Sequence, residues 1–165
     1  MPAKRVARRR ALIAGLGLLA GCGFQLRESV QLPFRTLYAD LPKGSSLAVE
    51  FARQARQGTT LVPSPEGAEA VLREVSEVRL KEPVSFSPSG RPREYELSYR
   101  VRFRLDGPDQ VELLPPTEIT IRRYITTSDI EQLSEELEEA FLYSEMENDM
   151  VQQILRRLGA VKMPR

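Results

Sequence analysis

The sequence predicts an α+β fold, a two-layer sandwich in which a mixed or antiparallel sheet of roughly four strands carries two helices on one face. Three observations support this prediction. Residues 95–105 alternate strictly between apolar and polar side chains, as in a strand that is buried on one side. Residues 47–57 and a long carboxyl-terminal segment carry apolar residues at helical spacing. Turn sequences rich in Gly, Pro, Ser and Asp separate the segments.

A strand and a helix are expected first. Residues 34–41 alternate weakly and end at a Pro-Lys-Gly sequence, which indicates a strand followed by a turn. Ser45 or Ser46 is expected to cap a helix over 47–57, and Gly58 to end it. One face of this helix is apolar and faces the core: Leu47, Ala48, Phe51, Ala52 and Ala55.

The next segments predict a long hairpin. A brief extended piece over 59–62 precedes a strand over 68–80, whose alternation slips in phase from Val75 onward. An exposed turn over 85–92 leads into the strand over 95–105. The apolar face of that strand is expected to carry Tyr95, Leu97, Tyr99, Val101, Phe103 and Leu105.

A last strand and a long helix complete the domain. The strand is expected over 118–125, extending from Val111 with an interruption at Pro115-Pro116. Ser128-Asp129-Ile130-Glu131 has the form of a capping box, which places the start of the helix there. Two arginines in the last turn and then Gly159 indicate its end.

The polar face of the strand over 95–105 carries three arginines. If both helices cover the apolar face, Arg100, Arg102 and Arg104 lie on the opposite side of the sheet. They must then meet water, a partner or an anionic ligand.

The first 21 residues resemble an export leader. A basic start without acids precedes about ten apolar residues, too few for the roughly 20 that span a bilayer. Leu19-Ala20-Gly21-Cys22 matches a bacterial lipobox, and Cys22 is the single cysteine of the chain. The alternative is an ordinary signal peptide with a cysteine nearby by chance. We expect a leader over 1–21, a lipid-anchored tether over 22–33 and one domain over 34–165.

Composition narrows the function classes. Five of the 24 basic residues and none of the 23 acidic residues lie in 1–21, so the chain from Cys22 onward has a net charge of about −4. Nucleic-acid binding is therefore not expected.

The chain contains no histidine, which removes the usual general base, the usual zinc ligand and the Ser-His-Asp hydrolases. No catalytic or metal site is expected. The acids of the terminal helix are expected to form a solvated face.

Three stretches carry a resemblance to a known family. They are Cys22-Gly23-Phe24-Gln25-Leu26-Arg27, Arg93-Glu94-Tyr95-Glu96-Leu97, and Tyr143-Ser144-Glu145-Met146 followed by Gln152 to Leu158. Together with the order of elements, they resemble the lipopolysaccharide-assembly lipoprotein family LptE.

The resemblance implies a role in the bacterial envelope. Members partner and plug the β-barrel LptD, assist its assembly and the delivery of lipopolysaccharide to the outer leaflet, and bind lipopolysaccharide; they are not enzymes. It also implies N-acyl and S-diacylglycerol lipids on Cys22, without another cofactor. By resemblance to enterobacterial lipoproteins, in which Asp after the cysteine favours retention in the inner membrane, Gly23 favours the outer membrane, with the domain on the periplasmic side.

Arginines are the candidate contacts for that role. Arg91 and Arg93 in the turn, with Arg122 and Arg123 near the end of the last strand, are the candidates for binding lipopolysaccharide phosphates. The alternatives are solvated arginines or contacts to the barrel wall. A second basic position of the family falls on Glu135 here.

The stripe of three arginines has two interpretations as well. Arg100, Arg102 and Arg104 contact a polar barrel lumen, or they form a solvated sheet face.

Two other functions of the protein stay open at this point. One is an envelope-assembly or cell-wall-binding lipoprotein scaffold, and the other is a lipid-anchored hydrolase, which the absence of histidine disfavours.

Overall fold

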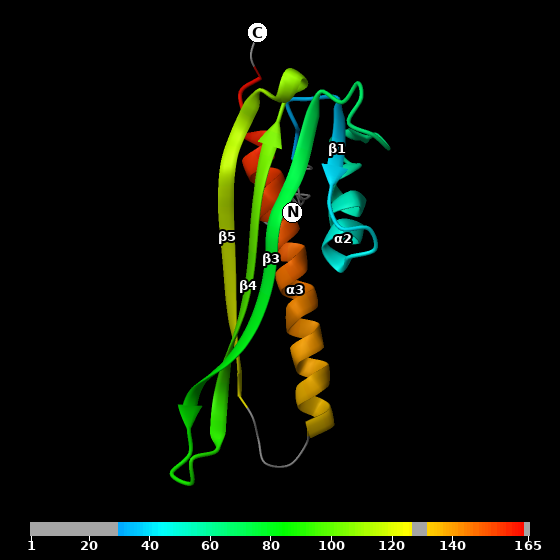
Figure 1. The fold of residues 1–165 in the computed structure, drawn as a ribbon. Coiled ribbons are helices and arrows are strands. Elements are labelled where there is room, and N and C mark those ends of the chain that lie inside the picture. Colours follow the sequence, from blue (N-terminus) through cyan, green and yellow to red (C-terminus); the bar gives the residue numbers. More distant parts are fainter. Residues whose placement is uncertain (1–29, 127–131, 164–165) are drawn as a thin grey trace, which may run out of the picture.

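The computed structural model describes residues 30–126 and 132–163. Five strands form one sheet in the order β2-β1-β3-β4-β5, so the predicted mixed sheet is confirmed with one strand more than expected. The strands are β1 (Thr36–Asp40), β2 (Thr60–Leu61), β3 (Ala70–Phe86), β4 (Pro92–Asp106) and β5 (Glu112–Thr126). The additional strand β2 is the brief extended piece predicted over 59–62. Figure 1 shows the long strands β3 to β5 side by side, with the helices behind them.

The first helix joins two parallel strands. β1 pairs in parallel with β2 and with β3, so α2 (Ser46–Ala55) is the crossover between β1 and β2. Of the two predicted capping residues, Ser45 is the N-cap, because its Oγ accepts a hydrogen bond of 3.1 Å from Ala48 N. The buried residues of α2 belong to the predicted apolar face: Leu47, Phe51 and Ala55.

The hairpin of β3 and β4 contains a β-bulge at the predicted phase slip. Their register shifts between Glu74 and Ser76, so Val75 is the additional residue. Beyond the bulge, Arg79 pairs with Tyr99, which is buried against the helices. Because alternate side chains share a face, the bulge turns the even-numbered side chains of β3 to the opposite face. Val78 and Leu80 are therefore exposed there.

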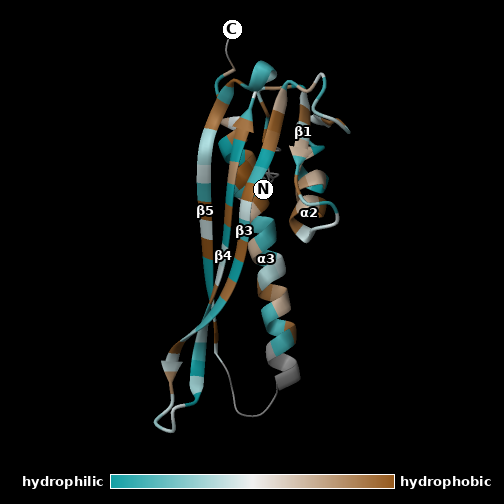
Figure 2. Cartoon of the chain, in the orientation of Figure 1, coloured by the Kyte–Doolittle hydropathy of each residue, from teal (hydrophilic) through white to brown (hydrophobic). Residues whose placement is uncertain are grey.

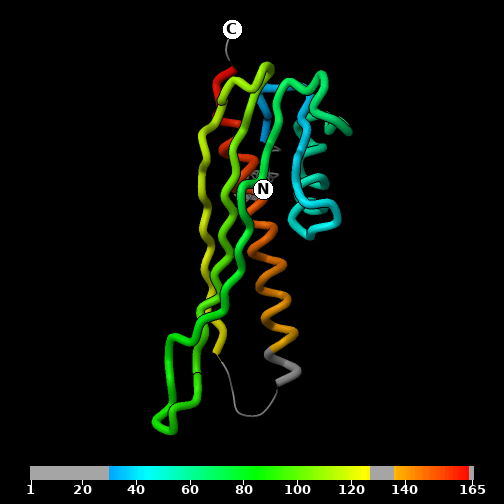
Figure 3. The backbone as a smooth tube through the Cα atoms, in the orientation of Figure 1, coloured from blue at the N-terminus to red at the C-terminus, as the bar shows by residue number. Residues whose placement is uncertain are grey.

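The predicted turn over 85–92 is shorter in the structure. β3 continues to Phe86 and β4 begins at Pro92, so only residues 87–91 connect them. Ser87 N donates to Arg91 O at 2.7 Å, and Gly90 adopts a φ of +80° that favours glycine. Figure 3 shows this hairpin extending away from the rest of the domain.

The two prolines of β5 distort the strand without ending it. β5 runs from Glu112 to Thr126, and its register against β4 shifts between the pairs Phe103–Thr117 and Leu105–Leu114. Pro115 and Pro116 lie within that shift. β5 is the outermost strand of the sheet, where a missing backbone N–H costs least. The predicted interruption is thus an irregularity in a continuous strand.

Both helices cover the same face of the sheet, as predicted. α3 (Gln132–Gly159) packs on β4 and β5 and contacts α2. The core contains the predicted apolar face of β4, and Figure 2 shows apolar and polar residues alternating along the long strands. The helix ends at Gly159, as predicted, whereas the capping box at 128–131 lies outside the described residues.

The described chain begins at the end of the domain where both helices terminate. A Cβ added to Gly58 would lie 2.4 Å from Val30 O, and one added to Gly159 would lie 2.8 Å from Val30 Cγ1. Val30 is therefore held between the ends of α2 and α3. No helix in the described ranges is long and apolar enough to cross a membrane.

Candidate functional site

The face of the sheet opposite the helices carries a group of arginines, which we call the arginine face: Arg100, Arg102 and Arg104 of β4 and Arg122 of β5. The core side chains Val101, Phe103 and Leu105 alternate with the β4 arginines and point toward the helices. The predicted position of Arg100, Arg102 and Arg104 on the open face is confirmed by this alternation. Their contact with a barrel lumen stays a prediction.

Most of these arginines have acidic neighbours on the same face. Arg104 Nη2 lies 3.2 Å from Asp106 Oδ2, and Arg73 Nε lies 3.0 Å from the same oxygen. Arg122 Nε lies 3.2 Å from Glu96 Oε1. The charges of the arginine face are therefore largely balanced, and Val78 and Leu80 of β3 are exposed beside them.

Two arginines of this face keep hydrogen-bonding capacity. Arg100 Nε lies 3.5 Å from Glu118 Oε1, too far for a good hydrogen bond, and it is buried without another partner among the described residues. Arg102 is exposed and forms no ion pair with any residue in 30–126 or 132–163. Arg102 is thus the arginine of this face whose guanidinium is most available to an external anion.

The candidates of the hairpin lie at a different place. Arg91 is exposed and ends the turn over 87–91, where its backbone N–H donates to Ser87 Oγ at 3.1 Å. Arg93 is exposed on β4 and forms no ion pair within the described part of the chain. Arg102 lies nine positions after Arg93 on β4, about 30 Å along an extended chain.

The structure also separates Arg122 from Arg123. Arg123 pairs with Leu97 in the register of β4 and β5, on the side that faces α3. Its Nη2 donates to Asp149 Oδ2 of α3 at 2.7 Å. The four residues predicted to bind lipopolysaccharide phosphate are therefore not brought together in one cluster.

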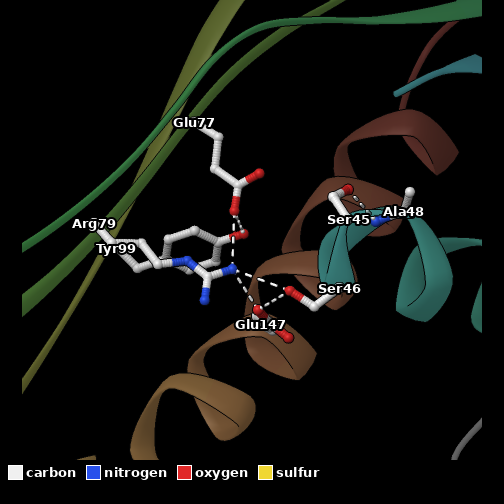
Figure 4. Close-up of polar contacts among 7 residues, drawn as sticks. All are labelled: Ser45, Ser46, Ala48, Glu77, Arg79, Tyr99 and Glu147. Carbon is white, nitrogen blue, oxygen red and sulfur yellow. Dashed lines mark hydrogen bonds and ion pairs between the residues drawn. The ribbon is translucent and has the colours of Figure 1, made fainter. Parts of the chain in front are cut away.

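A polar cluster between the sheet and the helices was not predicted (Figure 4). Glu77 Oε1 accepts hydrogen bonds of 2.9 Å from Tyr99 Oη and from Arg79 Nη2. Arg79 Nη2 also forms an ion pair with Glu147 of α3, and Ser46 Oγ of α2 donates to that carboxylate. Arg79 Nη2 also donates to Ser46 Oγ at 3.2 Å, so one guanidinium of β3 contacts both α2 and α3. The phase slip at Val75 was the signal, because the bulge turns Glu77, Arg79 and Lys81 toward α3.

The environment of this cluster favours a fixed charge on Arg79. Burial lowers the pKa of Arg79, but hydrogen bonds and charges from Glu77 and Glu147 outweigh burial and raise it. Burial and the hydrogen bond to Glu77 raise the pKa of Tyr99. Both groups keep their ordinary protonation at neutral pH, so the cluster is an ion-pair network that fastens α3 to the sheet.

The acidic run of α3 is only partly a solvated face. Glu139 pairs with Lys81 at 2.7 Å, Glu147 with Arg79, and Asp149 with Arg123. For Glu147 and Glu139 the predicted solvated face is wrong, because the bulged β3 presents cations to them, whereas the side chain of Asp149 is still 45% exposed beside Arg123. The side chain of Glu135, and Cys22, lie outside the described residues. Within those residues, no group of three or more acids is arranged to hold a metal ion.

Comparison with known proteins identifies the family. The model of the LptE family, described as lipopolysaccharide-assembly, matches residues 34–158. The chain belongs to the LptE family. The resemblance seen in the sequence is thereby confirmed, and LptE is not a known family of enzymes.

Individual relatives agree with this assignment. The LPS-assembly lipoprotein LptE of Pectobacterium atrosepticum is 27% identical over 157 residues, which cover 89% of this chain and 83% of that protein. The solution structure of the uncharacterized lipoprotein B of Nitrosomonas europaea is 38% identical, with a TM-score of 0.72, over 84% of this chain and 91% of that chain.

A more distant structure shares the fold alone. The crystal structure of the rare lipoprotein B of Shewanella oneidensis has a TM-score of 0.68 at 23% identity and covers 76% of this chain and 95% of that chain. The α+β sheet with helices on one face is therefore the LptE-like fold.

Proposed function

We propose that this LptE-family protein is an outer-membrane lipoprotein that occupies the lumen of an LptD-like β-barrel and assists its assembly and the delivery of lipopolysaccharide. The family match over residues 34–158 carries the proposal. In this proposal the protein performs no chemical step. It positions a barrel and an anionic glycolipid relative to each other.

Lipid modification of Cys22 attaches the domain to the membrane in this proposal. Two or more acyl chains are needed for a durable attachment, and a diacylglyceryl group with an N-acyl chain satisfies that need. Val30 lies eight positions after Cys22, a span of at most about 29 Å. The end of the domain that holds Val30 is then the membrane-proximal end, and the turn over 87–91 is remote from the anchor.

The arginine face is the proposed contact with the barrel wall. Transmembrane barrels that hold water have polar interiors, so a partner inside them needs polar, charge-balanced surfaces. The ion pairs Arg104–Asp106 and Arg122–Glu96 give this face such a character. An apolar outer face would not suit a polar lumen.

Direct lipopolysaccharide contact is assigned to the arginines that have no intramolecular counterion. Arginine binds phosphate bidentately, and a guanidinium already paired with a carboxylate is less available for this. Arg102 and Arg93 form no ion pair within the described ranges, so they are the preferred phosphate contacts. Arg123 already donates to Asp149, so it is a less favoured phosphate contact than Arg102 and Arg93.

Photo-crosslinking in living cells tests the proposal. A photoreactive amino acid replaces Arg102, Arg93 or Arg104 one at a time, with Arg156 as the matched control, because Arg156 is also an exposed arginine but lies on α3. We expect adducts with the mass of a barrel from 102 and 104, and adducts that react with anti-lipopolysaccharide antibodies from 102 and 93.

Two results would contradict the proposal. One is the absence of a barrel adduct at all three positions, together with purification of the protein free of any outer-membrane barrel. The other is an adduct with peptidoglycan or another assembly complex from the arginine face, which would favour the alternative of a cell-wall-binding or assembly scaffold.

A further inference from the structure

The first turns of α3 carry an apolar stripe on the face that α2 covers further along the helix. Leu137 is 66% exposed and Phe141 is 61% exposed, four residues apart and thus adjacent on one helix face. Ser144 and Asn148 continue the same face and lie against α2. The α3 residues that line the groove with α2 begin at Ser144, and Leu137 and Phe141 are exposed, so no described residue covers these two side chains.

A groove continues this stripe between the two helices. It has a volume of about 390 Å³ and is lined by Ser46, Val49, Glu50 and Arg53 of α2 and by Ser144, Glu145, Glu147 and Asn148 of α3. Val49 is 65% exposed and adds an apolar side chain to its wall. Leu137 and Phe141 of α3, together with Val49 of α2, form the apolar surface that we call the α3 stripe.

The charges around the α3 stripe are acidic. Glu138 follows Leu137, and Glu145 lies one turn beyond Phe141; both are exposed. The sequence has no Lys or Arg from 125 to 155. Arg53, which lines the groove, is already paired with Glu50. Lys81 and Arg123 pair with Glu139 and Asp149 of α3, and Arg79 pairs with Glu147, which also lines the groove. Each of these cations is thus already paired with an acid of α3.

We propose that the α3 stripe docks a cationic amphipathic helix of a partner protein, whose apolar residues pack on Phe141, Leu137 and Val49 and whose Lys or Arg side chains meet Glu138 and Glu145. Helices bind in such grooves through anchors at helical spacing. Charge complementarity selects this occupant, because an anionic lipid is repelled by the same carboxylates. The proposal is independent of the arginine face, which lies on the opposite side of the sheet.

Binding of defined peptides tests this site. The probes are two amphipathic peptides with the same apolar pattern, one built from Leu and Lys and one from Leu and Glu. Their affinity for the full chain carrying C22S, which prevents lipidation at Cys22, is measured by fluorescence anisotropy. We expect the Leu/Lys peptide to bind, its affinity to fall with ionic strength, and the Leu/Glu peptide not to bind.

Matched variants locate the site. Phe141→Ala is expected to weaken binding of the Leu/Lys peptide at least about tenfold, because an exposed aromatic anchor supplies much of the contact. Phe86→Ala, at a residue that is 57% exposed on β3, is the control and is expected to have no effect. Glu138→Gln with Glu145→Gln is expected to weaken binding about fivefold, and Glu112→Gln on β5 is its control.

Several results would overturn the proposal. They are no binding of the Leu/Lys peptide, equal binding of both peptides, or equal affinities of the Phe141→Ala and Phe86→Ala variants. Sedimentation of the chain without peptide provides a further test. Concentration-dependent dimers that Phe141→Ala abolishes would assign the stripe to a second copy of the chain instead. Far-UV circular dichroism confirms that each variant is folded.

Discussion

Arg123 Nη2 of β5 donates to Asp149 Oδ2 of α3 at 2.7 Å, on the side of the sheet opposite to Arg122. Two arginines that are adjacent in the sequence thus have different roles, because neighbouring residues of a strand point to opposite faces. Arg123 fastens the edge strand to the long helix, and Arg122 belongs to the arginine face.

The first prediction separates binding from stability with two single substitutions. Arg102→Ala is expected to change the free energy of unfolding by less than about 0.5 kcal/mol, because Arg102 is exposed and forms no ion pair within the described ranges. A photoreactive amino acid at position 100, two residues from Arg102 on the same face of β4, is expected to form a lipopolysaccharide adduct that Arg102→Ala removes. Urea denaturation and crosslinking measure the two effects.

Arg123→Ala is the matched counterpart, and it is expected to lower stability without affecting the lipopolysaccharide adduct. It removes a partly exposed ion pair, so the free energy of unfolding falls by about 0.5 kcal/mol, while the adduct stays. Loss of the adduct in Arg123→Ala but not in Arg102→Ala would reverse the assignment of the two residues.

The second prediction concerns the ion pair of Arg79 and Glu147. Arg79→Met leaves the carboxylate of Glu147, which is only 9% exposed, without its cation, so the free energy of unfolding is expected to fall by about 2 kcal/mol. Replacing both residues, Arg79→Met with Glu147→Leu, is expected to cost less than Arg79→Met alone, because the carboxylate of Glu147 is removed together with its cation, whereas Glu77 loses Arg79 in both variants. Urea denaturation of both variants measures this order, and a double variant that is less stable than the single one would contradict it.

The third prediction concerns Glu74, whose Oε2 is buried without a hydrogen-bond partner among the described residues. Burial, and then the nearby carboxylate of Glu77, raises the pKa of Glu74 above its ordinary 4.5. The folded chain holds this proton more tightly than the unfolded chain, so stability from this group is lost as pH rises from the ordinary value through the raised one.

Glu74→Gln is therefore expected to stabilise the protein at neutral pH. The amide keeps the shape of the protonated acid and carries no charge. Tm is therefore expected to rise by roughly 2 °C at pH 7, and to fall less steeply as the pH rises above the ordinary pKa of Glu74. Differential scanning calorimetry from pH 4 to pH 8 measures both effects. Glu112→Gln, at an exposed residue of β5, is the control, and an equal gain from it would refute the role of Glu74.

The fourth prediction concerns Gly58, which allows the chain at Val30 to pass close to the end of α2. A methyl group at Gly58 would lie 2.4 Å from Val30 O, so the backbone has to move. Gly58→Ala is expected to lower the free energy of unfolding by about 2 kcal/mol through this overpacking. Thermal unfolding measures the loss, and an unchanged Tm would show that the segment before β1 is not held there.

Sequence reasoning identified most of the elements but not all of their contacts. The strict alternation over 95–105 identified the buried face of β4 correctly, because the direction of successive side chains in a strand is a local property of the backbone. The end of α3 at Gly159 was also predicted correctly, because the signal for a helix end lies within a few residues of it. The pairing of Glu147 with Arg79 could not be predicted in this way, since it joins residues 68 positions apart.

The sequence by itself determined the α+β class, the predicted lipobox and the stripe of arginines, because each is a pattern within one segment of chain. The tertiary structure alone decided which charges meet. A single additional residue at Val75 turns Glu77, Arg79 and Lys81 toward α3, where Tyr99, Glu147 and Glu139 contact them. The physical reason is that alternation fixes only the relative direction of neighbouring side chains, whereas register and packing fix what each face meets.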